Sequence, residues 1–237
     1  MAYPAALSAG ASVFARLPAP TIATAGFRAT RAAYHSHNFE SARVSYSFQM
    51  AKPRKPNAPK ARLLSSRTAY RGPVFSVTTD HVLEPGGIRA RRDVVRHSGS
   101  IVVLAVDDRR SGPHILLEHQ YRHAAKAMMW ELPAGRIDDG EQELAAAKRE
   151  LLEETGYTAK YWKRILHFYV SPGFLDETMS IYLAKGLCAG IAQPEEDERI
   201  ETHFFPVSKA VGMVRRGLIQ DAKTIAGILW FAQGRGR

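Results

Sequence analysis

The 237-residue chain has a formal net charge of +10, and 45% of its residues are hydrophobic, enough for the core of one ordinary domain plus an extension. Its longest apolar run, residues 101–106, is far shorter than the roughly 20 residues that span a bilayer, so no transmembrane helix and no membrane partner are predicted. The single cysteine excludes a framework of internal disulfides and is typical of a reducing compartment.

The positive charge is concentrated near the N-terminus. Residues 1–62 hold nine of the 33 Lys and Arg but only one of the 23 acidic residues, Glu40, so they carry +8 of the net +10. The basic pI therefore reflects this segment and not a nucleic-acid-binding domain, and no nucleic-acid partner is expected. The segment is rich in Ala, Ser, Pro and Arg and lacks apolar periodicity, so we predict a disordered basic tail over 1–62.

Three interpretations of this tail stay open. The absence of acidic residues before Glu40 is typical of a mitochondrial or chloroplast transit peptide. Alternatively, translation starts at Met50 and the preceding residues are not made, which is the interpretation we favour. A nucleic-acid or partner-binding arm is the third. A start at Met50 implies a cytoplasmic protein, whereas a transit peptide implies a mitochondrial one.

The following region has the alternation and turn residues of a β-sheet. Residues 74–83 and 88–95 flank the turn residues Pro85-Gly86-Gly87, which predicts a β-hairpin ahead of the main sheet. Residues 100–106 are apolar on both faces, as in a central strand. Further strands are predicted over residues 114–121, 178–184 and 200–207.

Two helices are predicted in the C-terminal part. Ser208 is the expected N-cap of a helix over 209–216, which Gly217 ends. Asp221 opens the last helix. The apolar stripe of that helix consists of Ile225, Ile228, Leu229 and Phe231.

Residues 135–157 contain a third helix with an unusual charge pattern. Glu150, Glu153 and Glu154 stand at i, i+3 and i+4 and so project from one helix face, where their like charges repel one another. A divalent cation such as Mg²⁺ relieves this repulsion, because hard cations bind carboxylate oxygens and bridge them to phosphates. Leu144, Ala147 and Leu151 are expected to form the buried stripe on another face.

The same stretch resembles the Nudix box, G-x5-E-x7-R-E-U-x-E-E-x-G-U, in which U is a bulky aliphatic residue. Tyr157 departs from the pattern at the last position, where packing alone should be affected. A charged surface helix would explain the Glu and Arg residues but not two glycines at fixed offsets. The matching residues are Gly135, Glu141, Arg149, Glu150, Leu151, Glu153, Glu154 and Gly156.

Flanking residues resemble the ADP-ribose pyrophosphatase branch of the Nudix family. The sequence EHQYR at 118–122 is followed by WELPAG at 130–135, and SPGFLDE at 171–177 places Pro172 15 residues after Tyr157. The resemblance implies an α/β fold, a Nudix-type α/β/α sandwich with a mixed sheet over residues 63–237, preceded by the hairpin and the tail. It also implies a homodimer.

The resemblance assigns roles to particular residues. Mg²⁺, with Mn²⁺ as a substitute, is expected to be the cofactor, and the catalytic residues are expected to be Glu153, Arg149 and Glu196, the last as the base that activates water. Arg149 is expected to hold Glu153 in place, and Glu141 to anchor the loop to the helix. The expected metal ligands are the Ala134 carbonyl, Glu150, Glu153, Glu154 and Glu198. The expected substrate contacts are Arg122, Glu131, Pro172, Phe174 and Glu177.

The activity that the resemblance implies is hydrolysis of the pyrophosphate bond of ADP-ribose to AMP and ribose 5-phosphate. One alternative is a Nudix hydrolase of another nucleoside diphosphate derivative, such as GDP-mannose, another ADP-sugar, NADH or a dinucleoside polyphosphate. Another is a catalytically silent binding module, although such modules usually lose box carboxylates and this box keeps all of them. The sequence leaves the nucleobase preference open.

Overall fold

The protein is described by a computed structural model that covers residues 60–109, 111–193 and 199–234. The interpretations of the tail before residue 60 concern residues outside this description, as do the roles expected for Glu196 and Glu198. Within these ranges, none of the helices has the length and apolar character needed to span a membrane.

A small antiparallel sheet is the first element of the chain. It has the order β1-β2-β3 and consists of β1 (Arg62–Arg71), β2 (Ser76–Leu83) and β3 (Arg89–Arg96). The predicted hairpin is confirmed as β2 and β3, whose connection contains Gly86 and Gly87 at positive φ, as tight turns require. Strand β1 was not predicted, because all ten of its residues are exposed and it has no apolar face to reveal it.

The main sheet is mixed. Its strands β4 (Ser100–Asp107), β5 (His114–Arg122), β8 (Tyr157–Tyr169), β9 (Thr178–Ala189) and β10 (Ile200–Pro206) have the order β10-β5-β4-β9-β8. Two shorter strands are added to it, since β6 (Ala127–Glu131) pairs with β5 and β7 (Ala134–Arg136) pairs with β4. Strands β4 and β9 are parallel and the other pairs are antiparallel.

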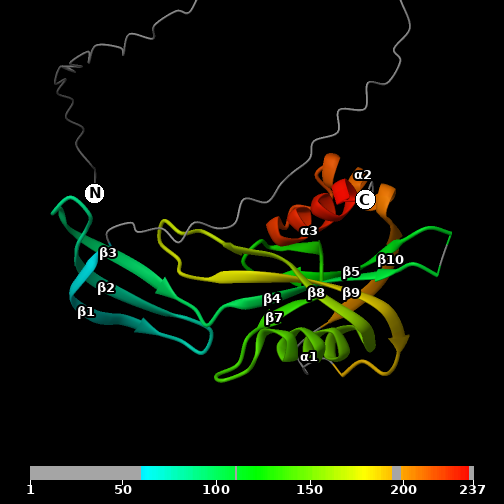
Figure 1. Cartoon of the computed structure of the whole chain (residues 1–237), viewed down its shortest axis with the longest axis horizontal. Helices are drawn as coiled ribbons and strands as arrows, with labels where there is room; N and C mark the ends of the chain where they lie inside the picture. Colours follow the sequence, from blue (N-terminus) through cyan, green and yellow to red (C-terminus); the bar gives the residue numbers. More distant parts are fainter. Residues whose placement is uncertain (1–59, 110, 194–198, 235–237) are drawn as a thin grey trace, which may run out of the picture. The chain divides into compact units, whose positions relative to one another are not determined.

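Helices cover both faces of this sheet. Helix α1 (Glu143–Thr155) lies on one side, and α2 (Val207–Arg215) and α3 (Ala222–Gln233) lie on the other (Figure 1). The predicted α/β/α sandwich with a mixed sheet is therefore confirmed.

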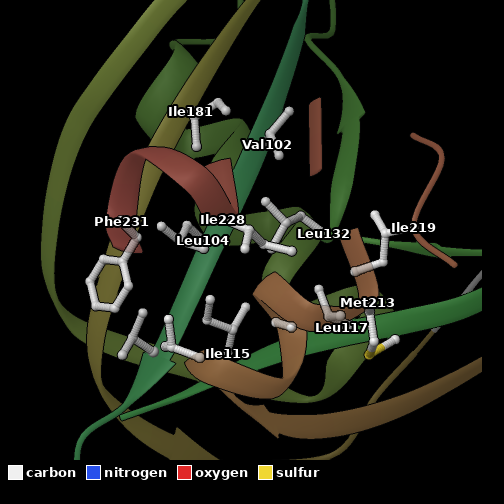
Figure 2. Close-up of a cluster of buried hydrophobic side chains, with 13 residues drawn as sticks. Val102, Leu104, Ile115, Leu117, Leu132, Ile181, Met213, Ile219, Ile228 and Phe231 are labelled. Carbon is white, nitrogen blue, oxygen red and sulfur yellow. The ribbon is translucent and has the colours of Figure 1, made fainter. Parts of the chain in front are cut away.

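Strand β4 explains how the two layers are held. Ile101, Val103 and Ala105 pack with the buried residues of α1, whereas Val102, Leu104 and Val106 pack with those of α2 and α3. Because successive side chains of a strand point to opposite faces, a strand that is apolar at every position can serve two cores. Figure 2 shows the second core, with Ile228 and Phe231 of α3 beside Leu104.

The caps and buried faces of the helices confirm one prediction and correct two. Asp221 is the N-cap of α3, and its carboxylate accepts the Thr224 backbone N–H at 3.0 Å. Ser208 is not the N-cap, because α2 begins at Val207 and its N-cap is Pro206, with φ of −50° and ψ of 139° and no side-chain cap bond. Leu144 is 37% exposed and does not belong to the buried face of α1. That face consists of Ala146, Ala147 and Leu151.

Candidate active site

Helix α1 places the box glutamates at the edge of β7. Its apolar face is buried against the main sheet, and the glutamates lie on the side of the helix that meets β7. The helix ends at Gly156, whose φ of 72° lets its N–H bond to the Leu152 carbonyl. A Cβ at Gly156 would also lie 2.6 Å from the Ala192 backbone nitrogen. The second box glycine is therefore required by both conformation and space.

Arg149 gathers the acidic residues of the box. Its Nη1 donates to Glu150 at 2.7 Å and to Glu153 at 3.1 Å, while its Nε and Nη2 donate to the two oxygens of Glu141 at 3.0 and 2.8 Å. Glu141 also accepts the backbone N–H of Asp138 at 3.2 Å. The structure thus places Arg149 on Glu153, as expected, and on two further carboxylates. Glu141 joins the loop to the helix.

These contacts shift the pKa values of Arg149 and Glu141 so that the charged form of each is favoured. Hydrogen bonding to Glu141 and Glu150 raises the pKa of Arg149 above its ordinary value despite partial burial, and the reciprocal bond lowers the pKa of Glu141. Both groups are therefore ionised at every pH near neutrality. The guanidinium is a permanent, rigid fork that holds the carboxylates in place.

Two box carboxylates lie directly on the backbone of β7. The Ala134 N–H donates to Glu154 Oε2 at 3.1 Å. A Cβ at Gly135 would lie only 1.9 Å from Glu150 Oε1, so this position must be glycine for the carboxylate to keep its place. Glu154 is 6% exposed, and the Ala134 N–H is one of the partners that a buried carboxylate needs.

The donor set suits a hard divalent cation. Among the residues that the structure describes, no three His, Cys, Asp or Glu side chains are grouped so that they could hold a metal ion. The positive charge between the box carboxylates is the guanidinium of Arg149. Even so, Glu150 and Glu153 share one guanidinium, and Glu150 and Glu154 share the 134–135 backbone. Carboxylate oxygens are the ligands that hard divalent cations take.

A second group of charged residues surrounds the buried carboxylate of Glu131, three residues before Ala134. Arg122 Nε and Nη2 donate to the two oxygens of Glu131 at 2.9 and 3.2 Å, and Lys223 of α3 donates to the same carboxylate. Burial raises the pKa of Glu131, but the bonds and charges of Arg122 and Lys223 outweigh it and hold that pKa below its usual value. Glu131, 4% exposed, therefore orients Arg122. The remaining guanidinium nitrogen, Nη1, is not used in the bonds to Glu131.

Sequence reasoning missed Lys223 and Thr224. Thr224 Oγ1 accepts the Leu132 backbone N–H at 2.8 Å, and Lys223 also lies 3.1 Å from Asp221. A lysine in the first turn of a helix opposes the helix dipole. Together with the Asp221 cap, that misplaced charge was the available signal of a nearby carboxylate.

The third group of expected residues lies on the loop before β9. Glu177 accepts the Ser100 hydroxyl at 2.7 Å, and its carboxylate is 3.8 Å from His97 Nδ1. Pro172 is exposed, and Phe174 is 57% exposed. Because Ser100 pairs with Arg136 of β7 and Met179 of β9, this loop ends next to the strand that carries the box backbone.

Comparison with known proteins agrees with this geometry. The family pattern described as NUDIX domain matches residues 95–227. The chain belongs to the Nudix family. It is 38% identical to the ADP-ribose pyrophosphatase of Mycobacterium tuberculosis over 170 residues, which cover 70% of this chain and 80% of that protein. It is 35% identical to the ADP-ribose pyrophosphatase of Bacillus subtilis over 169 residues, 70% of this chain and 90% of that protein.

Two other similarities concern substrate range and fold. The GDP-mannose pyrophosphatase of Cronobacter sakazakii is 34% identical over 172 residues, 68% of this chain and 87% of that protein. A solved structure described as an ADP compounds hydrolase superposes with a TM-score of 0.63 at 22% identity, covering 75% of this chain and 97% of that one. This last likeness concerns the fold alone.

Proposed function

We propose that this Nudix hydrolase cleaves the pyrophosphate bond of ADP-ribose with water, giving AMP and ribose 5-phosphate. The observation that carries the proposal is the convergence of Glu150 and Glu154 on the Ala134–Gly135 backbone, with Glu153 held beside them by Arg149. Relatives named ADP-ribose pyrophosphatase match the chain over 80 and 90% of their own lengths, which supports this substrate.

We infer that Glu150, Glu153, Glu154 and the Ala134 carbonyl hold Mg²⁺, or Mn²⁺ in its place, and that Glu198 is a further ligand. When bound, such an ion neutralises the pyrophosphate and polarises the phosphorus that water attacks. The carboxylates fit this role because each is oriented before substrate arrives, either by Arg149 or by the β7 backbone.

The remaining roles concern substrate and water. Arg122 donates through Nη1 to a phosphate oxygen, since Glu131 fixes the other edge of its guanidinium. Arg149 positions the carboxylates and does not touch the substrate. Glu196 takes the proton of the attacking water. The substrate contacts expected on the loop before β9 are Pro172, Phe174 and Glu177.

A homodimer accounts for the small sheet. Strand β1 is exposed along its whole length, and the β1–β3 region leaves several apolar side chains in solvent. A three-stranded sheet needs a hydrophobic face packed against something to be stable. We infer that a second copy covers it. The exposed apolar residues are Leu63, Leu64, Tyr70, Val74, Phe75 and Ile88.

The second candidate substrate is GDP-mannose, which the 34% identity to a GDP-mannose pyrophosphatase favours. The test is to compare kcat/KM for ADP-ribose, GDP-mannose, ADP-glucose, NADH and a diadenosine polyphosphate in the presence of Mg²⁺. We expect ADP-ribose to be preferred. Preference for GDP-mannose would keep the metal face and reject the substrate. The matched variants are Glu153→Gln, Glu154→Gln and, as a control on the small sheet, Glu84→Gln, whose partner is Arg92.

A further inference from the structure

The loop at residues 171–177 is bound to strand β3 through its backbone. The Val95 N–H donates to the Phe174 carbonyl at 2.8 Å, and the Asp176 N–H donates back to the Val95 carbonyl at 3.1 Å. Val95 and Leu175 form a parallel bridge between these two bonds. The loop thus pairs with the small sheet at one residue, although it connects β8 and β9 of the main sheet.

Arg96 fastens the same contact from the side-chain level. Its Nη1 donates to Asp176 Oδ2 at 3.0 Å, its Nη2 donates to Asp80, and its Nε donates to Thr78 Oγ1 at 3.1 Å. Asp80 is 4% exposed and also accepts the Ser66 hydroxyl at 2.6 Å. All three strands of the small sheet therefore contribute to the position of one guanidinium, which reaches the loop.

Asp176 is held at both carboxylate oxygens and at its backbone N–H. Besides the bond from Arg96, its Oδ1 accepts the His97 N–H at 2.9 Å, and its own N–H donates to the Val95 carbonyl. Bonds between charged partners and backbone groups are about twice as strong as neutral ones. The Phe174 carbonyl is held by the Val95 N–H, yet Phe174 is 57% exposed. The structure thus leaves more than half of the surface of this aromatic residue in solvent.

This loop is continuous with the candidate active site. Glu177 follows Asp176 and accepts the Ser100 hydroxyl, and Ser100 pairs with Arg136 of β7. A second link joins the small sheet to β7 directly, since Arg136 Nη1 donates to the Pro73 carbonyl at 2.7 Å. Hydrogen bonds therefore link β3 to the side of the site formed by the loop before β9.

We propose that Arg96 and Asp176 are positioning residues for substrate, and that the small sheet sets the place of loop 171–177 through them. This inference deepens the proposed function and rests on it, because the loop carries the expected substrate contacts Pro172, Phe174 and Glu177. Neither Arg96 nor Asp176 touches the reacting phosphates. Their effect is on binding, so loosening the loop raises KM and leaves kcat nearly unchanged.

The test measures loop docking and catalysis separately. In full-length Arg96→Ala and Asp176→Asn variants, hydrogen exchange of the Val95 and Asp176 amides should be about tenfold faster, the factor that corresponds to roughly 1.4 kcal/mol. The Val103 amide, bonded to the Pro133 carbonyl within the main sheet, should be unchanged. KM for ADP-ribose should rise about tenfold, with kcat within about threefold of wild type.

Arg92→Ala is the matched control, because Arg92 lies on the same strand but its partner is Glu84, after β2, and not the loop. Exchange and KM should stay at the wild-type values. Unchanged exchange in the Asp176→Asn variant, or faster exchange with an unchanged KM, would overturn the inference. If Arg96→Ala does not fold, Asp176→Asn still decides, since it leaves the Asp80 pair intact. If wild-type protein leaves ADP-ribose intact but cleaves another nucleotide, the proposed substrate is wrong. The KM for that other nucleotide then tests the inference about the loop.

Discussion

Gly135→Ala tests the arrangement of the box carboxylates without removing any of them. An added Cβ would lie 1.9 Å from Glu150 Oε1, whereas ordinary contact begins at 3.4 Å, so the carboxylate must retreat by about 1.5 Å. Gly135 is not among the glycines with positive φ, so alanine suits its backbone. The obstacle is the end of the Glu150 side chain and not backbone, so the carboxylate gives way and strand β7 keeps its place.

The expected result is therefore a separation of activity from stability. A misplacement of 1 Å can cost on the order of 100-fold in rate, so kcat/KM for ADP-ribose should fall by about 100-fold or more. The melting temperature should stay equal or rise slightly, because alanine narrows the unfolded ensemble. Steady-state kinetics at saturating Mg²⁺ and calorimetry give the two quantities.

The control is Gly234→Ala, which meets no atom within 4 Å and has a φ of −75°. It should keep both activity and stability. Gly135→Ala with wild-type activity would refute the reasoning, because Glu150 would then work from a displaced position. A large loss of stability would also refute it, since the loss of rate would no longer report the position of a carboxylate.

Three further predictions concern other parts of the molecule. Arg149→Lys should lower kcat by about 10- to 100-fold, because a single ammonium cannot replace a fork bound to three carboxylates; wild-type kcat would contradict this. Since the folded pKa of Glu131 is depressed, its stabilisation is complete above the unfolded pKa near 4.5 and is lost as the pH falls toward the folded value. Acid titration of unfolding should lack this component in Glu131→Gln, and an unchanged slope would argue against it. Ile228→Ala should lower the free energy of unfolding by roughly 2–5 kcal/mol in denaturant titrations, and a loss below about 1 kcal/mol would contradict its place in the core.

The parts of the fold that sequence predicted are those in which burial imposes a pattern. Residues 101–106 are apolar throughout because β4 serves two cores, and that need is visible in sequence. The Asp221 cap was predictable for a similar reason, since its bond to Thr224 is local. The box helix was predicted with its three glutamates, although Leu144 was wrongly placed on the buried face.

The parts that escaped prediction depend on contacts distant in sequence. Strand β1 has no buried face, so its residues show no periodicity. Lys223 acts through Glu131, which is 92 residues away along the chain. Arg96 and Asp176 are separated by 80 residues, and nothing local relates them. The prediction that Ser208 is an N-cap was wrong for another reason. Helix α2 already begins at Val207, and its N-cap is Pro206, which is not a preferred N-cap residue.

Product identification tests the central claim most directly. Purified protein would be incubated with ADP-ribose and Mg²⁺, and the products identified by mass spectrometry alongside Glu153→Gln and Glu154→Gln. The account predicts AMP and ribose 5-phosphate from wild type, and the loss of both products in the two variants. Intact ADP-ribose after exposure to wild-type protein, or equal product from the variants, would contradict it.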